Sequence, residues 1–154
     1  MGTWNVSTGT AGYYGSDYAY AFAGTGSQTA SWSFSLGAEG QYAIDALWTS
    51  HSNRASNAPY SIYNNGVLIT TVRVNQRVNG GLPFNCLADL PLQAGTVTII
   101  LSDDANGIVI ADAVQVTYLG PPQNVAPNGS IDNPTANLSI PVGDTVSFIG
   151  SGTD

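Results

Sequence analysis

Lysine is absent from this sequence, and positively charged side chains of any kind are scarce. Three arginines stand against ten acidic residues in a chain of 154, so the formal net charge is −7. Nucleic-acid binding needs clustered Lys and Arg to neutralise phosphates, and anionic membrane surfaces attract proteins through the same clusters. The sequence therefore predicts no nucleic-acid partner and no membrane partner. Its surface must be built from Ser, Thr, Asn, Gln and Gly, whose neutral hydrogen-bonding groups suit a sugar.

Cysteine and histidine occur once each, as Cys86 and His51. A single cysteine excludes an internal disulfide, and one residue of each type cannot supply the several ligands of a transition-metal site. We expect Cys86 to be a small, buried, apolar residue. Apolar runs long enough for a membrane span are missing, as is a signal peptide after Met1. We therefore interpret the chain as a fragment excised from a longer secreted protein.

Motifs for nucleophilic catalysis are also missing, because no Gly-x-Ser-x-Gly turn occurs around any serine. A glycosidase needs two carboxylates across a cleft, which Asp17 could form with Asp104 or Asp112. A polysaccharide lyase needs a Tyr or His base with a charge-neutralising partner, and His51, Tyr60 and Arg54 offer such groups. The module is short for a glycosidase cleft. We predict that this chain is not an enzyme, whether or not its parent protein is one.

Short alternating apolar segments separated by Gly, Asn, Asp and Pro are abundant, and no stretch has the apolar period of a helix. Asn65 and Gly66 can supply the positive φ angles of a type I′ hairpin turn. The predicted strands cover residues 32–36, 42–48, 60–75 as a hairpin, 85–92, 96–102 and 108–118. Many short strands at this spacing predict an all-β fold, a β-sandwich of the jelly-roll type with long loops at its ends.

The composition divides the chain into three parts. Residues 1–119 carry the strand pattern, and residues 120–130 form a linker rich in Pro and Asn. Residues 131–154 resemble the opening of the Ig-like and PKD-like repeats of bacterial surface and polysaccharide-degrading proteins, with two alternating segments between Leu138 and Phe148. Only the start of such a repeat is present. We therefore expect a truncated domain that forms an extended C-terminal tail.

Three long insertions interrupt the strand pattern, at residues 9–29, 49–59 and 76–83, and the first two are rich in aromatic, amide or charged side chains. Sugar C–H faces stack on aromatic rings while sugar hydroxyls bond Asp, Asn and Arg, so such loops suit a sugar site. The alternative is that several of the tyrosines only cover the end of the sandwich. The predicted carbohydrate-binding residues are Tyr14, Asp17, Tyr18, Tyr20, Trp48, His51, Asn53, Arg54, Asn57 and Tyr60.

Asp112 shares its strand parity with Ile110 and Val114, so alternation places its carboxylate on the core side of a strand. An unpaired ionised carboxylate there is costly, and it must find Arg54, backbone N–H groups, a tyrosine hydroxyl or a metal ion. Two roles for Arg54 therefore stay open. One is a structural ion pair with Asp112, and the other is a bidentate clamp on the carboxylate of a uronic acid.

Calcium is the one cofactor candidate. Asp103, Asp104 and Asn106 offer hard oxygen ligands within a single turn, and sandwiches of this type often carry structural calcium. Their spacing differs from that of an EF-hand loop, and an ordinary Asp and Asn β-turn is the alternative explanation. We predict no other cofactor.

Four ordered segments of the first 118 residues carry a resemblance to a known family. They are Gly12-Tyr13-Tyr14-Gly15-Ser16-Asp17-Tyr18, Ser52-Asn53-Arg54-Ala55-Ser56-Asn57-Ala58-Pro59-Tyr60, Val74-Asn75-Gln76 and Ala105-Asn106-Gly107-Ile108-Val109-Ile110-Ala111-Asp112-Ala113-Val114. In these segments the chain resembles the golvesin C-terminal-like domain, which also occurs in xanthan lyases and related secreted bacterial proteins. The resemblance implies a β-sandwich of the galactose-binding-like type and a carbohydrate-binding role. Many members carry a Trp after an Asn-Gly-Gly turn, where this chain has Leu82-Pro83-Phe84.

Together these features predict a non-catalytic carbohydrate-binding module of a secreted bacterial polysaccharide-active or surface protein. Its expected partners are a polysaccharide and the attached domains of the parent protein, and its expected location is extracellular. Two other functions stay open. A structural or adhesion spacer would bind protein partners, and a small lyase or hydrolase would cleave the polysaccharide.

Overall fold

The structure is a computed structural model that describes residues 4–122, 130–133, 139, 141–147 and 149–151. The chain falls into two compact units, Met1–Pro122 and Gln123–Asp154. Within the described residues, no helix has the length and apolar character needed to cross a membrane. All regular elements in this part of the chain are strands, as the sequence predicted.

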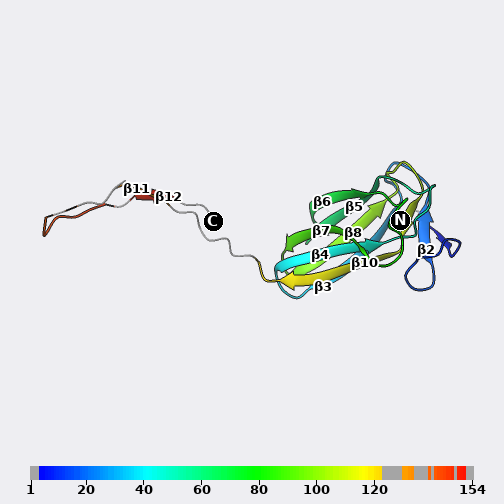
Figure 1. The fold of residues 1–154 in the computed structure, drawn as a ribbon, viewed down its shortest axis with the longest axis horizontal. Coiled ribbons are helices and arrows are strands. Elements are labelled where there is room, and N and C mark those ends of the chain that lie inside the picture. The colour runs from blue at the N-terminus through cyan, green and yellow to red at the C-terminus, as the bar shows by residue number, and fades with distance from the viewer. Residues whose placement is uncertain (1–3, 123–129, 134–138, 140, 148, 152–154) are drawn as a thin grey trace. The chain divides into compact units, whose positions relative to one another are not determined.

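The first unit contains ten strands in its described residues (Figure 1). Their bounds are β1 (Asn5–Ser7), β2 (Tyr18–Ala21), β3 (Thr29–Leu36), β4 (Gly40–Leu47), β5 (Ala58–Asn64), β6 (Val67–Val74), β7 (Asn85–Leu92), β8 (Gly95–Ser102), β9 (Val109–Ala111) and β10 (Ala113–Gly120). Two antiparallel sheets form the body of the unit, with strand orders β3-β8-β5-β6 and β10-β4-β7. This arrangement confirms the predicted β-sandwich.

The core lies between these two sheets and is built by strand alternation. On β8, Val97, Ile99 and Leu101 are fully buried, and on β4 Ile44 and Ala46 are fully buried as well. These residues belong to one hydrophobic cluster that draws on both sheets. The two inner faces predicted from the sequence are therefore confirmed, because successive side chains of a strand point to opposite faces.

The predicted hairpin turn is also confirmed. Asn65 has φ 50° and Gly66 has φ 81°, so both central residues lie in the left-handed region that a type I′ turn requires. The side chain of Asn64 accepts the Gln93 N–H at 2.8 Å, and its amide donates to the carbonyl oxygens of Gln93 and Thr96. The hairpin between β5 and β6 is thereby tied to the turn between β7 and β8.

A third sheet, β1-β2-β9, was not foreseen. The sequence predicted one strand over residues 108–118, but the structure divides it at Asp112 into β9 and β10, which belong to different sheets. The segment 9–29 showed no strand pattern, yet it contains β2, which pairs with β1 and β9. A four-residue strand at a sheet junction has too few residues for a periodicity to show. In Figure 1, β2 lies at the end of the first unit away from the C-terminal end of β10.

Cys86 is exposed, so the expectation that it is a buried apolar residue is wrong. The register of β7 is the reason: Leu87 and Leu92 take the inward positions and Cys86 faces outward opposite Asp45 of β4. Partial desolvation of the Cys86 thiol, together with the nearby carboxylates of Asp89 and Asp45, raises its pKa.

The second unit contains β11 (Ser130–Asn133) antiparallel to β12 (Ile149–Ser151). The sequence predicted strand segments between Leu138 and Phe148, and both of these residues lie outside the described part of the chain. Residues 139 and 141–147 are described, and they form a turn and irregular backbone rather than strands. The proposed start of an Ig-like or PKD-like repeat stays a prediction.

Candidate functional site

A hollow of about 360 Å³ opens where insertions 9–29 and 49–59 meet, beside the sheet β1-β2-β9. The first insertion contributes side chains from β2 and the residues on either side of it, and the second contributes the turn before β5. The lining residues are Ser7, Gly9, Thr10, Tyr18, Tyr20, Phe22, His51, Asn53, Arg54 and Ile108. Five of the ten predicted carbohydrate-binding residues are therefore brought together at one place.

Backbone hydrogen bonds hold the second insertion in position. Arg54 and Ile108 form an isolated parallel bridge, in which the Ile108 N–H donates to the Asn53 carbonyl at 3.2 Å and the Ala55 N–H donates to the Ile108 carbonyl at 2.8 Å. Ile108 leads directly into β9, which pairs with β2. Insertions 9–29 and 49–59 are thus both attached to the sheet β1-β2-β9, so strand pairing in this sheet sets the distance between them across the hollow.

One wall of the hollow is aromatic. Tyr18 and Tyr20 lie two residues apart on β2 and therefore project to the same side of the strand. The Tyr20 and Phe22 rings meet edge to face, with centroids 5.9 Å apart and planes at 85°. Phe22 is 62% exposed, so much of its ring surface is open to solvent. An exposed ring held by a second ring is a suitable stacking surface for a planar or C–H-rich ligand.

Arg54 lies at the base of this site and is only 5% exposed. Its Nη2 donates to Thr10 Oγ1 at 3.1 Å and to the Tyr18 hydroxyl at 3.2 Å, and its Nη1 donates to Asn53 Oδ1 at 3.1 Å. Weaker contacts run from Nη2 and Nε to the hydroxyl and carbonyl oxygens of Thr49. All of these acceptors are neutral oxygens.

The positive charge of Arg54 affects Tyr18. Burial by itself raises the pKa of the Tyr18 hydroxyl, but hydrogen bonds from Ser7, Thr10 and Arg54, together with the Arg54 charge, outweigh it and lower the pKa. The Arg54 guanidinium also lies 5.6 Å from the centre of the Tyr18 ring. The hollow therefore has a locally positive character in an acidic protein.

His51 and Asn53 form the polar rim. His51 Nδ1 lies 2.9 Å from Asn53 Oδ1, the same oxygen that accepts from Arg54, and both residues are exposed. With its proton on Nδ1, the imidazole donates to this oxygen, and Asn53 Oδ1 then accepts from two donors. The Asn53 Nδ2 group makes no hydrogen bond to any described residue, so it is a donor open to a ligand.

The predicted ion pair between Arg54 and Asp112 is not formed. The carboxylate oxygens of Asp112 accept the Tyr14 N–H at 3.1 and 3.2 Å, and among the described residues the ion pair within 4.0 Å joins Arg73 to Asp104 instead. The strand break at Asp112 is the physical reason, because alternation along a continuous strand no longer applies there. Burial, with a smaller effect of the Asp17 charge, raises the pKa of Asp112 to about 6.

Trp48 and Tyr60 do not belong to the site, which corrects two of the predicted residues. Trp48 is 3% exposed and Tyr60 is 1% exposed, and both pack in the core cluster. The Trp48 indole N–H donates to the Val78 carbonyl at 3.0 Å, and the Tyr60 hydroxyl accepts from Gln76 Nε2 at 3.3 Å. They flank insertion 49–59 in the sequence, but both rings lie in the core: Tyr60 is on an inward-facing position of β5, and Trp48 is buried in the segment just after β4.

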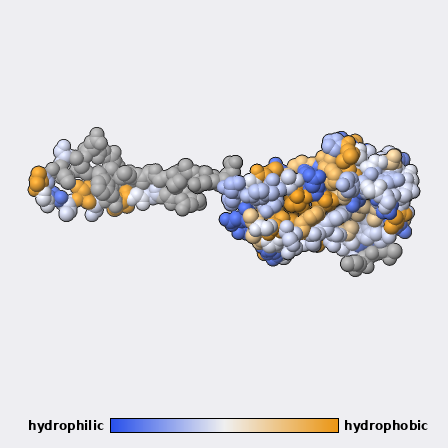
Figure 2. Space-filling view, turned by 90° about the horizontal axis from the view of Figure 1, so that it is seen from below, coloured by the Kyte–Doolittle hydropathy of each residue, from blue (hydrophilic) through white to orange (hydrophobic). Residues whose placement is uncertain are grey.

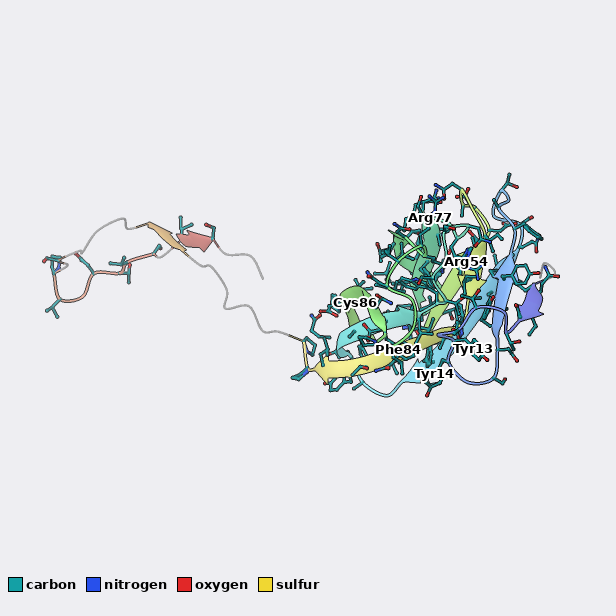
Figure 3. All side chains as sticks on the ribbon, turned by 45° about the vertical axis from the view of Figure 1, so that its right-hand side comes forward. Tyr13, Tyr14, Arg54, Arg77, Phe84 and Cys86 are labelled. Carbon is teal, nitrogen blue, oxygen red and sulfur yellow. The ribbon has the colours of Figure 1, made fainter. Side chains whose placement is uncertain are left out.

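Three more predicted residues lie near the insertions without lining the hollow. Tyr14 is 60% exposed and its ring meets Phe84 edge to face, with centroids 5.7 Å apart (Figure 3). Asp17 is exposed and accepts a hydrogen bond from the neighbouring serine hydroxyl at 3.0 Å. Asn57 uses Oδ1 to accept the Asn106 N–H at 2.8 Å. Their sugar-binding role stays a prediction that this hollow does not support.

The calcium candidate is not assembled either. Asp103 is 2% exposed and its Oδ1 accepts backbone N–H groups, Asp104 Oδ2 pairs with Arg73 at 2.6 Å, and Asn106 Oδ1 accepts the Ser56 N–H at 2.9 Å. Each oxygen is directed at a different partner. No group of three or more His, Cys, Asp or Glu side chains in the described ranges is placed to hold a metal ion. The alternative explanation, an ordinary Asp and Asn β-turn, accounts for these three residues.

The sequence missed five residues of the hollow. They are Ser7, Gly9, Thr10, Phe22 and Ile108. The first three come from β1 and the loop after it, which reach the site only because β1 pairs with β2. Phe22 is clustered with four tyrosines in the sequence, and this cluster could have predicted its place in the hollow. The other four residues had no such signal.

A second hollow, of about 460 Å³, lies at the open seam between the edge strands β3 and β10. Its lining is mostly apolar and includes Phe34, Leu36, Tyr42, Val116 and Tyr118. The rings of Tyr42 and Tyr118 lie 5.1 Å apart, and Tyr118 is 49% exposed. Apolar residues also gather across the middle of one face of the first unit in Figure 2.

Several solved structures are similar to this chain, and they include an enzyme and two carbohydrate-binding modules. A xanthan lyase from Paenibacillus is 32% identical with a TM-score of 0.69, over 77% of this chain and 12% of the lyase. A family 35 carbohydrate-binding module from an environmental isolate is 23% identical, with a TM-score of 0.55 over 75% of this chain and 83% of the module. The corresponding module from Clostridium thermocellum is 21% identical, with a TM-score of 0.54 over 75% and 88%. At this identity the two modules show a shared fold.

The sequence of this chain shows its family. No curated protein matches the chain. The model of the Golvesin C-terminal domain matches residues 1–118, which include all three insertions and the strands from β1 to most of β10. This chain therefore belongs to the Golvesin C-terminal domain family.

Proposed function

We propose that the first unit is a non-catalytic carbohydrate-binding module and that the hollow between insertions 9–29 and 49–59 is its sugar site. The observation that supports this most is the convergence of an aromatic wall and a polar rim on one hollow. Tyr20 and Phe22 offer ring surface, while His51 and Asn53 offer hydrogen-bonding groups. A sugar needs both, because its C–H faces stack on rings and its hydroxyls need donors and acceptors.

The size and rigidity of the hollow fit this role. A volume of about 360 Å³ is at the lower end of ligand pockets, which span roughly 300–1,000 Å³. The walls stand on paired strands and on the Arg54 to Ile108 bridge, so little ordering is needed when a ligand binds. We infer that the site takes one or a few sugar units of a longer chain.

The relatives support an accessory role in an extracellular polysaccharide-active protein. The similar segment of the Paenibacillus xanthan lyase is 12% of that enzyme, so the domain is one part of a much larger protein there. Two other similar structures are carbohydrate-binding modules by name. A module attached to an enzyme raises the local concentration of that enzyme at its polymer. We infer the same arrangement for this chain, with attached domains of its parent protein as further partners.

Affinity electrophoresis and calorimetry with a broad polysaccharide panel test this proposal. The full chain should bind at least one polymer, and Phe22→Ala should weaken that binding about tenfold, since an aromatic contact contributes roughly 0.5–1.5 kcal/mol beyond its buried area. Tyr118→Ala is the matched control, because this exposed ring lies in the other hollow and its removal should leave binding unchanged.

Two outcomes would contradict the proposal. Absence of binding to every polymer would remove it, and a loss of binding in Tyr118→Ala but not in Phe22→Ala would place the site in the other hollow. Release of unsaturated sugar products during incubation would instead indicate a lyase. The hydroxyl of Tyr18, which lies beside Arg54 with a lowered pKa, would then be the first candidate for its base.

A further inference from the structure

Arg54 is a buried cation that is surrounded by neutral groups. It is 5% exposed, and its side chain donates to oxygens of Thr10, Tyr18, Thr49 and Asn53. Among the described residues no carboxylate lies within 4.0 Å of its guanidinium. Arg73 behaves differently, because it is well exposed and pairs with Asp104. Of the three arginines, Arg54 alone is buried, and it has no counter-charge within 4.0 Å among the described residues.

Burial of the Arg54 guanidinium without a nearby anion is energetically unfavourable. Neutral hydrogen bonds satisfy individual N–H groups, but they leave the net positive charge of the guanidinium uncompensated, and buried charges in proteins are normally paired. The sequence left two roles open for Arg54, an internal pair with Asp112 or a clamp on a ligand carboxylate. Asp112 bonds the Tyr14 N–H instead, so the first role is removed and the second remains.

The surroundings of Arg54 favour an anionic ligand. The chain has a net charge of −7, yet no Asp or Glu is among the described residues that line this hollow. Nη1 of Arg54 carries two N–H groups and makes one hydrogen bond in the described structure, to Asn53. Asn53 Nδ2 is uncommitted as well. The site therefore offers spare donors next to a buried positive charge, and a carboxylate is the acceptor that matches them.

We propose that this hollow recognises a sugar that carries a carboxylate, that is, a uronate unit of an acidic polysaccharide. Arg54 supplies the counter-charge, Asn53 Nδ2 at the rim donates to the carboxylate or to a neighbouring hydroxyl, and His51 accepts from a sugar hydroxyl. The ring of Phe22 contacts the sugar face. This inference rests on the proposed function, because it names the class of sugar that the same site binds. A purely structural Arg54 would give a site that does not distinguish acidic from neutral sugars.

Calorimetry with paired ligands separates these two cases. The full chain is titrated with glucuronate, galacturonate and mannuronate oligosaccharides and with the methyl ester of each, which keeps the sugar and removes the charge. We expect at least one free acid to bind about tenfold or more tightly than its ester, and the difference to shrink at high salt. Equal binding of acid and ester would overturn the inference and leave carbohydrate binding intact. A panel in which no polysaccharide binds at all would remove the proposed function itself.

A pair of variants tests the role of the Arg54 charge without removing Arg54, whose loss could unfold the site. Asn53→Asp places a carboxylate where Asn53 Oδ1 now accepts from Arg54, so the protein supplies the missing anion itself. We expect this variant to keep its melting temperature and lose the preference for the acid. Asn57→Asp is the matched control, since it adds the same charge at a residue that does not line the hollow. An acid preference unchanged in Asn53→Asp would contradict the inference, as would an equal loss in Asn57→Asp.

Discussion

Asp112 shows how one side chain can make this module sensitive to pH. Its half-buried carboxylate accepts the Tyr14 N–H and thereby connects insertion 9–29 to the junction between β9 and β10. Burial, with a contribution from the Asp17 charge, raises its pKa to about 6 from an ordinary value of 3.8. The folded protein therefore binds this proton more tightly than the unfolded chain does.

This difference in the pKa of Asp112 between the folded and unfolded states sets the direction in which pH changes the stability of the protein. A raised pKa in the folded state means that Asp112 makes folding more favourable as the pH falls from about 6 towards 3.8. Asp112→Asn keeps an oxygen for the Tyr14 N–H but removes the titration. We expect the melting temperature of the variant to depend less on pH in this window, measured by scanning calorimetry. Glu39→Gln, at an exposed glutamate, is the control, and identical pH profiles for Asp112→Asn and the unchanged protein would refute the assignment.

At the scale of secondary-structure elements, the side chain of Gln76 makes hydrogen bonds to β9 that a neighbouring strand would otherwise make. Gln76 is fully buried, and its Oε1 accepts the Ile110 N–H at 2.8 Å while its Nε2 donates to the Ile110 carbonyl at 2.8 Å and to the Tyr60 hydroxyl at 3.3 Å. An amide side chain offers the same donor and acceptor as a backbone peptide, so Gln76 extends the ladder of this three-residue strand. It thus fixes the strand to which β2 and the hollow are attached.

Removal of that amide should be costly. Gln76→Ala leaves the N–H and carbonyl of Ile110 and the hydroxyl of Tyr60 without these partners inside the protein, and each such loss costs about 1–3 kcal/mol. We expect the free energy of unfolding, measured by urea denaturation, to fall by about 3 kcal/mol or more. Gln115→Ala, at an exposed glutamine of β10, should change it by less than about 0.5 kcal/mol. A small effect in Gln76→Ala would mean that water or another side chain replaces the amide.

At the scale of the whole molecule, we expect the first unit to fold independently of the second. Its core cluster and its sandwich sheets come from residues before Pro122, and so does the hollow. A chain that ends at Pro122 should therefore keep the melting temperature and the sugar affinity of the full chain. Scanning calorimetry and titration with the same ligand check this expectation. A clear drop in melting temperature would show that residues 123–154 contribute to the stability of the first unit.

The sequence by itself determined the sandwich and indicated the two insertions that line the proposed site. Alternating apolar residues such as Val97, Ile99 and Leu101 bury the same face wherever the strand pairs, and the positive φ angles of Asn65 and Gly66 depend only on local sterics. The shortage of charge and the aromatic content of the insertions are likewise properties of composition. These features could be predicted because each depends on neighbours in the sequence or on composition alone.

Only the tertiary structure decided which side chains meet and what charges they face. Pairing between β1, β2 and β9 links residues far apart in the chain, so Thr10 and Ile108 reach the hollow without any local signal. The change of sheet at Asp112 directed its carboxylate to Tyr14 and left Arg54 with neutral partners. The physical reason is that strand alternation specifies a face only within one continuous strand, whereas the partner of a buried charge depends on where separate strands are brought together.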